Sequence, residues 1–287
     1  MPFMEKRIQS GELLEVERYF CTRDGRKIPR GENVGDTPED MGAVNERNSR
    51  KLLNRLIHCN FSGTAGSLLL LLTHDRFLTE AEAYREERNF IARLNRAREK
   101  KGQEPARWIA VTEKQGRWHH HIILDGGMTL EELKELWGDR GLMSVSPLRD
   151  TDTYEELAKY LTEAHKPPKG KPMEDSLKPE RQKGRRRWHA SRNLARPVIT
   201  KKIIGRPPRP GQPTPPKGYR LLPNWFIGCD MLGNLFTYFS CMREGGEAAH
   251  APKARAGGLN GVRGRSPGGA RGGAPRGRAN REGRENL

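Results

Sequence analysis

Hydrophobic and polar residues follow two different periods along the middle of the chain, and the switches between them predict alternating strands and helices. Four segments have the short apolar or alternating pattern typical of strands: SLLLLLT (67–73), RWIAVTE (107–113), RWHHHIIL (117–124) and GLMSVSPL (141–148). Amphipathic stretches follow three Thr-x-x-Glu signals of helix starts, at Thr79, Thr129 and Thr153. The order βαββαβα predicts an α+β fold with a ferredoxin-like (split βαβ) antiparallel sheet and packed helices.

The first 60 residues add a ribbon and a helix to this pattern. LLEVERYF (13–20) and RKIP (26–29) are strand-like, and TRDGR between them has an Asp-Gly pair typical of hairpins. Residues 1–41 are therefore predicted to form an N-terminal β-ribbon. The leucine spacing of residues 42–58 indicates an amphipathic helix, which opens a core domain over 42–166.

The composition changes after Lys166. Residues 166–220 hold 17 Lys and Arg against three acidic residues and are rich in Pro and Gly, so 167–219 is predicted to be a basic arm or linker. Apolar and aromatic residues return in 220–240 and predict a small docking lobe over 220–250. Ten glycines among arginines in 251–287 predict a disordered basic C-terminal tail.

The net charge narrows the class of partner. The chain carries a formal charge of +17, which favours a polyanion such as nucleic acid. Its four cysteines are far apart and form no CxxC pair, and the longest apolar run is too short to cross a bilayer. We therefore expect a cytoplasmic protein without a membrane contact.

Three of the eight histidines stand together in RWHHHIIL. On a strand, His119 and His121 share one face and His120 points to the other. Glu113 on the preceding strand would complete a two-imidazole, one-carboxylate site suited to Mg²⁺ or Mn²⁺. The three side chains must share one face of the sheet. A two-residue turn would put Glu113 on the opposite face, so the set requires a bulge or an odd-length connection. The alternative is a group of half-exposed histidines beside a strand-end carboxylate.

The helix that starts near Thr153 carries a candidate nucleophile. Its apolar stripe is centred near Tyr154, which is predicted to lie in the core, while Tyr160 falls at the edge of the stripe. Tyr160 is therefore predicted to pack its ring and present its hydroxyl at the surface. An ordinary boundary tyrosine is the alternative.

The basic arm interleaves cations with an aromatic residue, a mixture that tracks phosphates and stacks a base. The candidate DNA-binding residues are Arg185, Arg186, Arg187, Trp188, Arg192, Lys201 and Lys202. A solvated charge run is the alternative interpretation.

Four segments, in this order, resemble the HUH endonucleases, the rolling-circle replication initiators of plasmids, phages and mobile elements. The segments are LLLLLT, IAVTEK, GRWHHHIIL and the helical KYLTE. WHASRNLARP (188–197) is also similar to a downstream signature of bacterial replication proteins. The resemblance covers residues 42–204. One position departs from it, because the family often has a lysine one turn after the tyrosine, where this chain has Glu163.

The resemblance implies a metal-dependent enzyme that nicks and joins single-stranded DNA at a replication origin. Tyr160 would be the nucleophile, forming a 5′-phosphotyrosyl intermediate, and Glu113, His119 and His121 would bind the metal. A host polymerase would extend the free 3′-hydroxyl, and a host helicase would unwind the duplex because the sequence has no GxxxxGK[ST] motif. The alternatives are a related relaxase or transposase, and a noncatalytic nucleic-acid-binding protein on the same scaffold.

Overall fold

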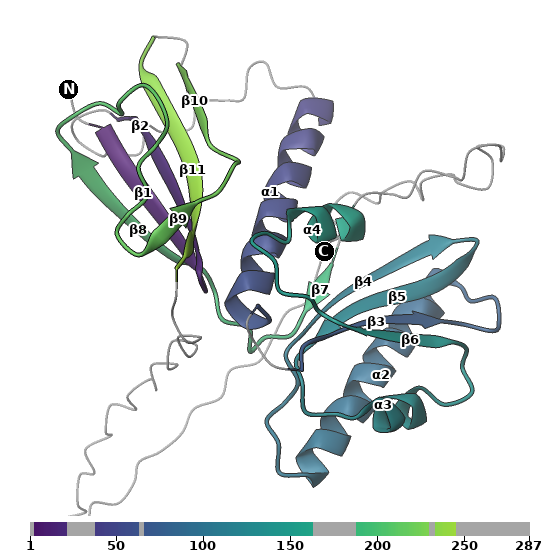
Figure 1. Ribbon diagram of the computed structural model, residues 1–287. Coiled ribbons are helices and arrows are strands. Elements are labelled where there is room, and N and C mark those ends of the chain that lie inside the picture. Colours follow the sequence, from purple (N-terminus) through teal and green to yellow (C-terminus); the bar gives the residue numbers. More distant parts are fainter. Residues whose placement is uncertain (1–2, 22–37, 63–65, 163–187, 230–232, 245–287) are drawn as a thin grey trace, which may run out of the picture. The chain divides into compact units, whose positions relative to one another are not determined.

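Two antiparallel sheets and four helices make up the described part of the chain (Figure 1), which confirms the predicted α+β class. The computed structural model describes residues 3–21, 38–62, 66–162, 188–229 and 233–244. Its helices are α1 (Pro38–Asn60), α2 (Glu80–Lys100), α3 (Leu130–Trp137) and α4 (Glu155–Thr162).

One sheet contains the predicted βαββαβα core. Its five strands run in the order β6-β3-β5-β4-β7. Their bounds are β3 (Leu68–Thr73), β4 (Trp108–Gln115), β5 (Arg117–Leu124), β6 (Met143–Pro147) and β7 (His189–Ala190). Because β5 lies between β3 and β4, and β3 lies between β5 and β6, each βαβ unit is split by a strand of the other. The finer ferredoxin-like assignment stays a prediction, with which this order is compatible.

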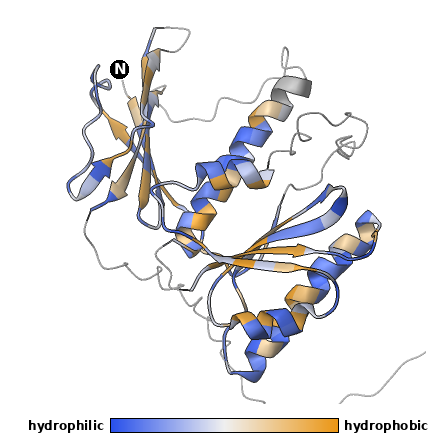
Figure 2. Cartoon of the chain, turned by 45° about the vertical axis from the view of Figure 1, so that its right-hand side comes forward, coloured by the Kyte–Doolittle hydropathy of each residue, from blue (hydrophilic) through white to orange (hydrophobic). Residues whose placement is uncertain are grey.

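Helices pack on both faces of this sheet, and Figure 2 shows that they have hydrophobic and hydrophilic sides. On one face, α2 and α3 bury Phe90, Leu94 and Trp137 against Leu72 and Ile122. On the other face, α1 and α4 form a second cluster with the sheet, which includes Leu56, Ile57, Ala158, Leu161 and Ile123. The two faces of β5 therefore meet different helices, and this separates His119 and His121 from His120.

Local hydrogen bonds explain where the helices begin. The predicted capping boxes at Thr79 and Thr129 are both present, each closed by the glutamate three residues later. The start of α4 differs. The Thr153 hydroxyl accepts from the Glu155 N–H (3.2 Å), and the Tyr154 N–H donates to Asn54 Oδ1 of α1 (2.8 Å). A side chain of α1 therefore fixes where α4 begins.

The second sheet joins both ends of the described chain. It has six strands in the order β10-β11-β2-β1-β8, and β9 also pairs with β11. Their bounds are β1 (Phe3–Ser10), β2 (Leu13–Phe20), β8 (Val198–Ile204), β9 (Tyr219–Leu221), β10 (Phe226–Cys229) and β11 (Leu235–Arg243). The predicted N-terminal ribbon and docking lobe are thus parts of one sheet, not separate units.

The N-terminal hairpin is present at a different place from the one predicted. Strands β1 and β2 turn at Gly11 and Glu12, and the RKIP segment lies outside the described residues. Gly11 has φ +56°, and a Cβ there would lie 2.3 Å from the His58 carbonyl oxygen of α1. Glycine is therefore required both by the turn and by the close approach of α1.

The second half of the predicted basic arm or linker over 167–219 contains strands. Residues 188–219 contribute β7 to one sheet, and β8 and the start of β9 to the other. Strand β8 is held by β1, which pairs Lys202 with Glu5 and Lys201 with Lys6. The side chains of β8 are almost all exposed, so its order as a strand depends on this long-range pairing. The first half of the arm and the predicted tail lie outside the described residues.

Candidate metal centre and nucleophile

The connection between β4 and β5 places Glu113 on the face of the two candidate histidines. Gly116 alone separates the two strands, with φ +72°, and the pairing runs Gln115 with Arg117 and Glu113 with His119. This is the odd-length connection that the ligand set requires. Thr112 pairs with His120, so its side chain lies on the opposite face.

Glu113, His119 and His121 form a compact group that could hold a metal ion. Glu113 Oε1 lies 3.1 Å from His119 Nε2 and 3.0 Å from His121 Nε2. The possible ligand atoms of the three residues all lie within 4.8 Å of one another. In addition, His119 Nδ1 lies 3.2 Å from the Arg117 carbonyl oxygen, to which it can donate. That hydrogen bond leaves Nε2 as the metal-facing nitrogen of His119.

The pKa shifts at this group have a common cause. Burial alone raises the pKa of Glu113, but the hydrogen bonds and charge of His119 and His121 outweigh it and lower the pKa to about 2. Burial alone lowers the pKa of His119, but Glu113 and the Arg117 carbonyl outweigh it, so the net shift is upward. The carboxylate is therefore ionised at neutral pH, and metal binding would compete with protonation of the His119 imidazole.

Tyr160 lies beside this group and is partly exposed, and its place at the edge of the apolar stripe predicts that exposure. Its ring packs edge-to-face on His121, with centroids 5.5 Å apart and an interplanar angle of 80°. Tyr160 is 47% exposed, whereas Tyr154 is buried at 2% and lies in the core of α1 and α4. The structure thus brings an accessible tyrosine to the side of a candidate metal ligand.

Four of the predicted DNA-binding residues lie in the described part of the chain, and they are divided between different segments. Arg185, Arg186 and Arg187 lie outside the described residues, as does Glu163. Arg192, Lys201 and Lys202 are exposed, and the two lysines belong to the six-stranded sheet rather than to the sheet of the histidines.

Trp188 has a structural role that the base-stacking prediction did not include. Its Nε1 donates to Ser49 Oγ of α1 (3.1 Å), and its half-buried ring packs against the cluster formed with α1 and α4. Stacking of this ring on a DNA base stays a prediction.

Polar side chains behind β5 form a buried hydrogen-bonded chain, which the sequence pattern did not predict. Thr112 Oγ1 donates to Glu87 Oε2 (2.5 Å) and lies 2.7 Å from His120 Nδ1, while His120 Nε2 lies 2.8 Å from His74 Nε2. Because the single hydroxyl hydrogen of Thr112 goes to Glu87, His120 Nδ1 must donate to Thr112 and His120 Nε2 must accept from His74. Burial, together with the charge of His74, lowers the pKa of His120 to about 3, which keeps its ring neutral.

The pattern of residues in α2 contained one signal for this hydrogen-bonded chain. Glu87 falls among the buried residues Ala83, Phe90 and Ile91 on the apolar side of α2, where an unpaired carboxylate would be costly. It accepts from Thr112 and lies 3.1 Å from His189 Nδ1 of β7. This hydrogen-bonded chain fixes the face of β5 that carries His120, and so keeps His119 and His121 on the opposite face.

Comparisons with protein-family models, curated proteins and solved structures find no match for this chain. No helix in the described ranges combines the length and the apolar character needed to span a membrane. The functional conclusion therefore depends on the geometry of the site.

Proposed function

We propose that this protein is a metal-dependent endonuclease and strand transferase that nicks and joins single-stranded DNA at an origin, and so initiates rolling-circle replication. The observation that carries the proposal is the packing of Tyr160 against His121 at the edge of a Glu113, His119 and His121 cluster. A noncatalytic binding protein has no need for a half-exposed tyrosine beside a two-histidine, one-carboxylate site.

The proposed role of Tyr160 is nucleophilic attack. Its phenolic oxygen bonds to the scissile phosphorus and its proton leaves to solvent, to which the side chain is open. The bond from phosphorus to the 3′ oxygen breaks, and that oxygen keeps the electron pair and takes a proton from water. The products are a 5′-phosphotyrosyl enzyme and a free 3′-hydroxyl, and the reverse reaction reseals the strand.

Glu113, His119 and His121 would hold the divalent ion, with Mg²⁺ or Mn²⁺ favoured by the mixed oxygen and nitrogen donors. When bound, such an ion polarises the phosphate as a Lewis acid, which helps because a free phenol ionises only near pH ~10. The edge-to-face contact with His121 orients the Tyr160 ring, and the Glu87 chain behind β5 keeps the two histidines in place.

In this proposal the 3′-hydroxyl is extended by a host polymerase, and a host helicase opens the duplex in the cytoplasm. A relaxase or a transposase would use the same residues for the same chemistry on a different substrate. The covalent DNA–tyrosine intermediate is common to all three, so it is the product to measure.

The test is a search for a protein–DNA adduct. Purified protein is incubated with Mn²⁺ and end-labelled single-stranded oligonucleotides that tile its own replicon, and is then run on a denaturing gel. We expect an adduct with the wild type and none with Tyr160→Phe or His121→Ala. Tyr154→Phe is the matched control, because it removes a hydroxyl from a buried tyrosine just before α4 and should leave the adduct intact.

Peptide mass spectrometry of the adduct should place the phosphodiester on Tyr160. An adduct that persists in Tyr160→Phe would assign another nucleophile. DNA binding without an adduct under Mn²⁺ or Mg²⁺ would favour the noncatalytic binding protein.

A further inference from the structure

A row of four polar side chains crosses one face of the six-stranded sheet. Thr237 of β11 is paired with Arg18 of β2, Arg18 with Glu5 of β1, and Glu5 with Lys202 of β8. Side chains at directly paired positions point to the same face of a sheet. The N-terminal hairpin and two strands from much later in the sequence thus contribute to one continuous polar surface.

This row forms the floor of a hollow of about 800 Å³, which adjoins a second one of about 510 Å³. Residues 205–210 and 212–214, a stretch rich in Pro, line the larger hollow beside the floor. One acidic residue, Glu5, lines the two hollows, together with five basic residues: Arg7, Arg18, Lys202, Arg206 and Arg209. The excess of positive charge favours an anion.

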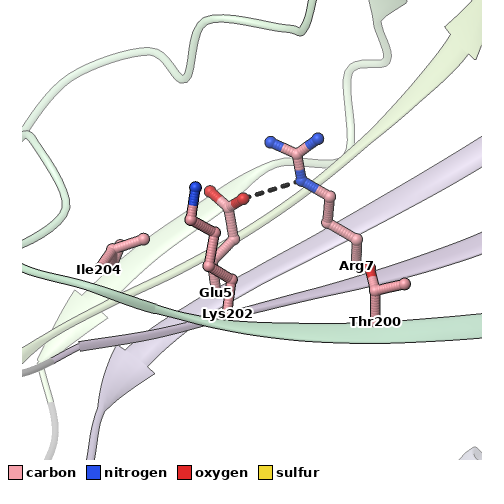
Figure 3. A pocket seen from close by; sticks show the side chains of 5 residues that line it. All are labelled: Glu5, Arg7, Thr200, Lys202 and Ile204. Carbon is pink, nitrogen blue, oxygen red and sulfur yellow. Dashed lines mark hydrogen bonds and ion pairs between the residues drawn. The ribbon is translucent and has the colours of Figure 1, made fainter.

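The single carboxylate is engaged by two of these cations. Glu5 Oε1 accepts from Arg7 Nε (2.8 Å) and Glu5 Oε2 accepts from Arg18 Nε (2.7 Å). Figure 3 shows that Arg7 meets Glu5 through one nitrogen, while its two terminal nitrogens point away from the carboxylate. Arg18 is also held over the Phe239 ring, 5.4 Å from its centroid. Glu5 therefore orients the two guanidinium groups rather than cancelling the charge of the hollow.

Thr237 gives an independent indication of a ligand. The residue is only 3% exposed and lines the larger hollow. Its Oγ1 is buried and has no hydrogen-bond partner in the part of the chain that the structure describes. Buried hydroxyls are nearly always paired, because an unpaired one loses its bonds to water without compensation. An acceptor oxygen in the hollow would satisfy this group.

We infer that this hollow is a phosphate-binding pocket for the backbone of a DNA strand, separate from the metal centre. Phosphodiester oxygens accept from each kind of donor present, namely lysine, arginine and a threonine hydroxyl. The formal charge of +17 on the chain is consistent with such a partner. The inference does not depend on the proposed nicking reaction, since binding here needs neither Tyr160 nor a metal ion.

The test is the affinity of the full-length protein for labelled oligothymidine, measured by fluorescence anisotropy in EDTA. Lys202→Ala is compared with Lys134→Ala, which removes the same charge from an exposed position on α3 that does not line either hollow. For one lost contact to single-stranded DNA we expect the Kd to rise about fivefold at about 0.1 M salt. The salt slope should fall by about 0.7. Lys134→Ala should change the Kd less than about twofold, as an exposed charge outside the contact does.

Thr237→Val supplies a second readout, because it keeps the β-branched shape and removes only the hydroxyl. We expect weaker DNA binding with an unchanged or higher melting temperature, whereas a hydroxyl with only a structural role would leave binding unaffected. Equal losses in Lys134→Ala and Lys202→Ala would overturn the pocket in favour of general charge attraction. Unchanged binding in Thr237→Val would remove Thr237 from the site. Because the assay contains EDTA, these results are independent of whether an adduct forms.

Discussion

Replacing Glu113 by Gln tests the candidate metal centre in the absence of metal. The substitution keeps the size of the side chain and an acceptor oxygen, but removes the charge that faces His119 and His121. If the two imidazoles and the carboxylate meet in solution as they do in the structure, the penalty for this change must depend on pH.

The sign and size follow from the pKa values. The pKa of Glu113 is lowered from 4.5 to about 2, so its ionisation stabilises the fold fully above pH 4.5 and is lost as the pH falls toward 2. The difference between these two pKa values corresponds to a contribution of about 3 kcal/mol to the free energy of unfolding. Because the side chain is 19% exposed, solvent screening reduces this and we expect about 2 kcal/mol. The raised pKa of His119 adds stability that is complete below pH 6.5 and is lost at higher pH.

The assay is urea unfolding in EDTA at pH 3, 5.5 and 8.5. The free energy of unfolding of Glu113→Gln should fall below that of the wild type most strongly at pH 5.5, and less at the two extremes. Glu104→Gln is the matched control, because Glu104 is an exposed loop carboxylate. A penalty for Glu113→Gln that is equal at all three pH values would refute the proposed contact between Glu113 and the histidines.

Two further substitutions test the surroundings of the site by urea unfolding. Thr112→Val breaks the buried chain between His120 and Glu87 and should cost about 2–4 kcal/mol. Thr112→Ser should retain most of the stability, and equal losses would contradict the role of the hydroxyl. Trp188→Phe removes the hydrogen bond to Ser49 and should cost about 1 kcal/mol with unchanged affinity for oligothymidine. Weaker DNA binding at unchanged stability would instead return Trp188 to the DNA surface.

Several features of this protein are determined by residues that are close together in the sequence. The period of apolar positions gives the order of elements from β3 to α4, and two Thr-x-x-Glu boxes mark where α2 and α3 begin. The same reasoning puts His119 and His121 on one face of β5 and Tyr160 at the edge of an apolar stripe. Each of these follows from local geometry, namely the two-residue period of a strand and the 3.6-residue period of a helix.

Only the tertiary structure decides which segments meet. A connection of one residue, Gly116, sets the face on which Glu113 lies, and the alternation of β4 is compatible with either face. The pairing of β8 with β1 places a mostly exposed segment at the end of a sheet, and packing against α1 gives Trp188 a structural contact. Contacts between distant segments depend on complementary surfaces and on the entropy of closing long loops. Neither property is contained in the spacing of neighbouring residues, so the sequence predicts the ligands but not how the chain assembles around them.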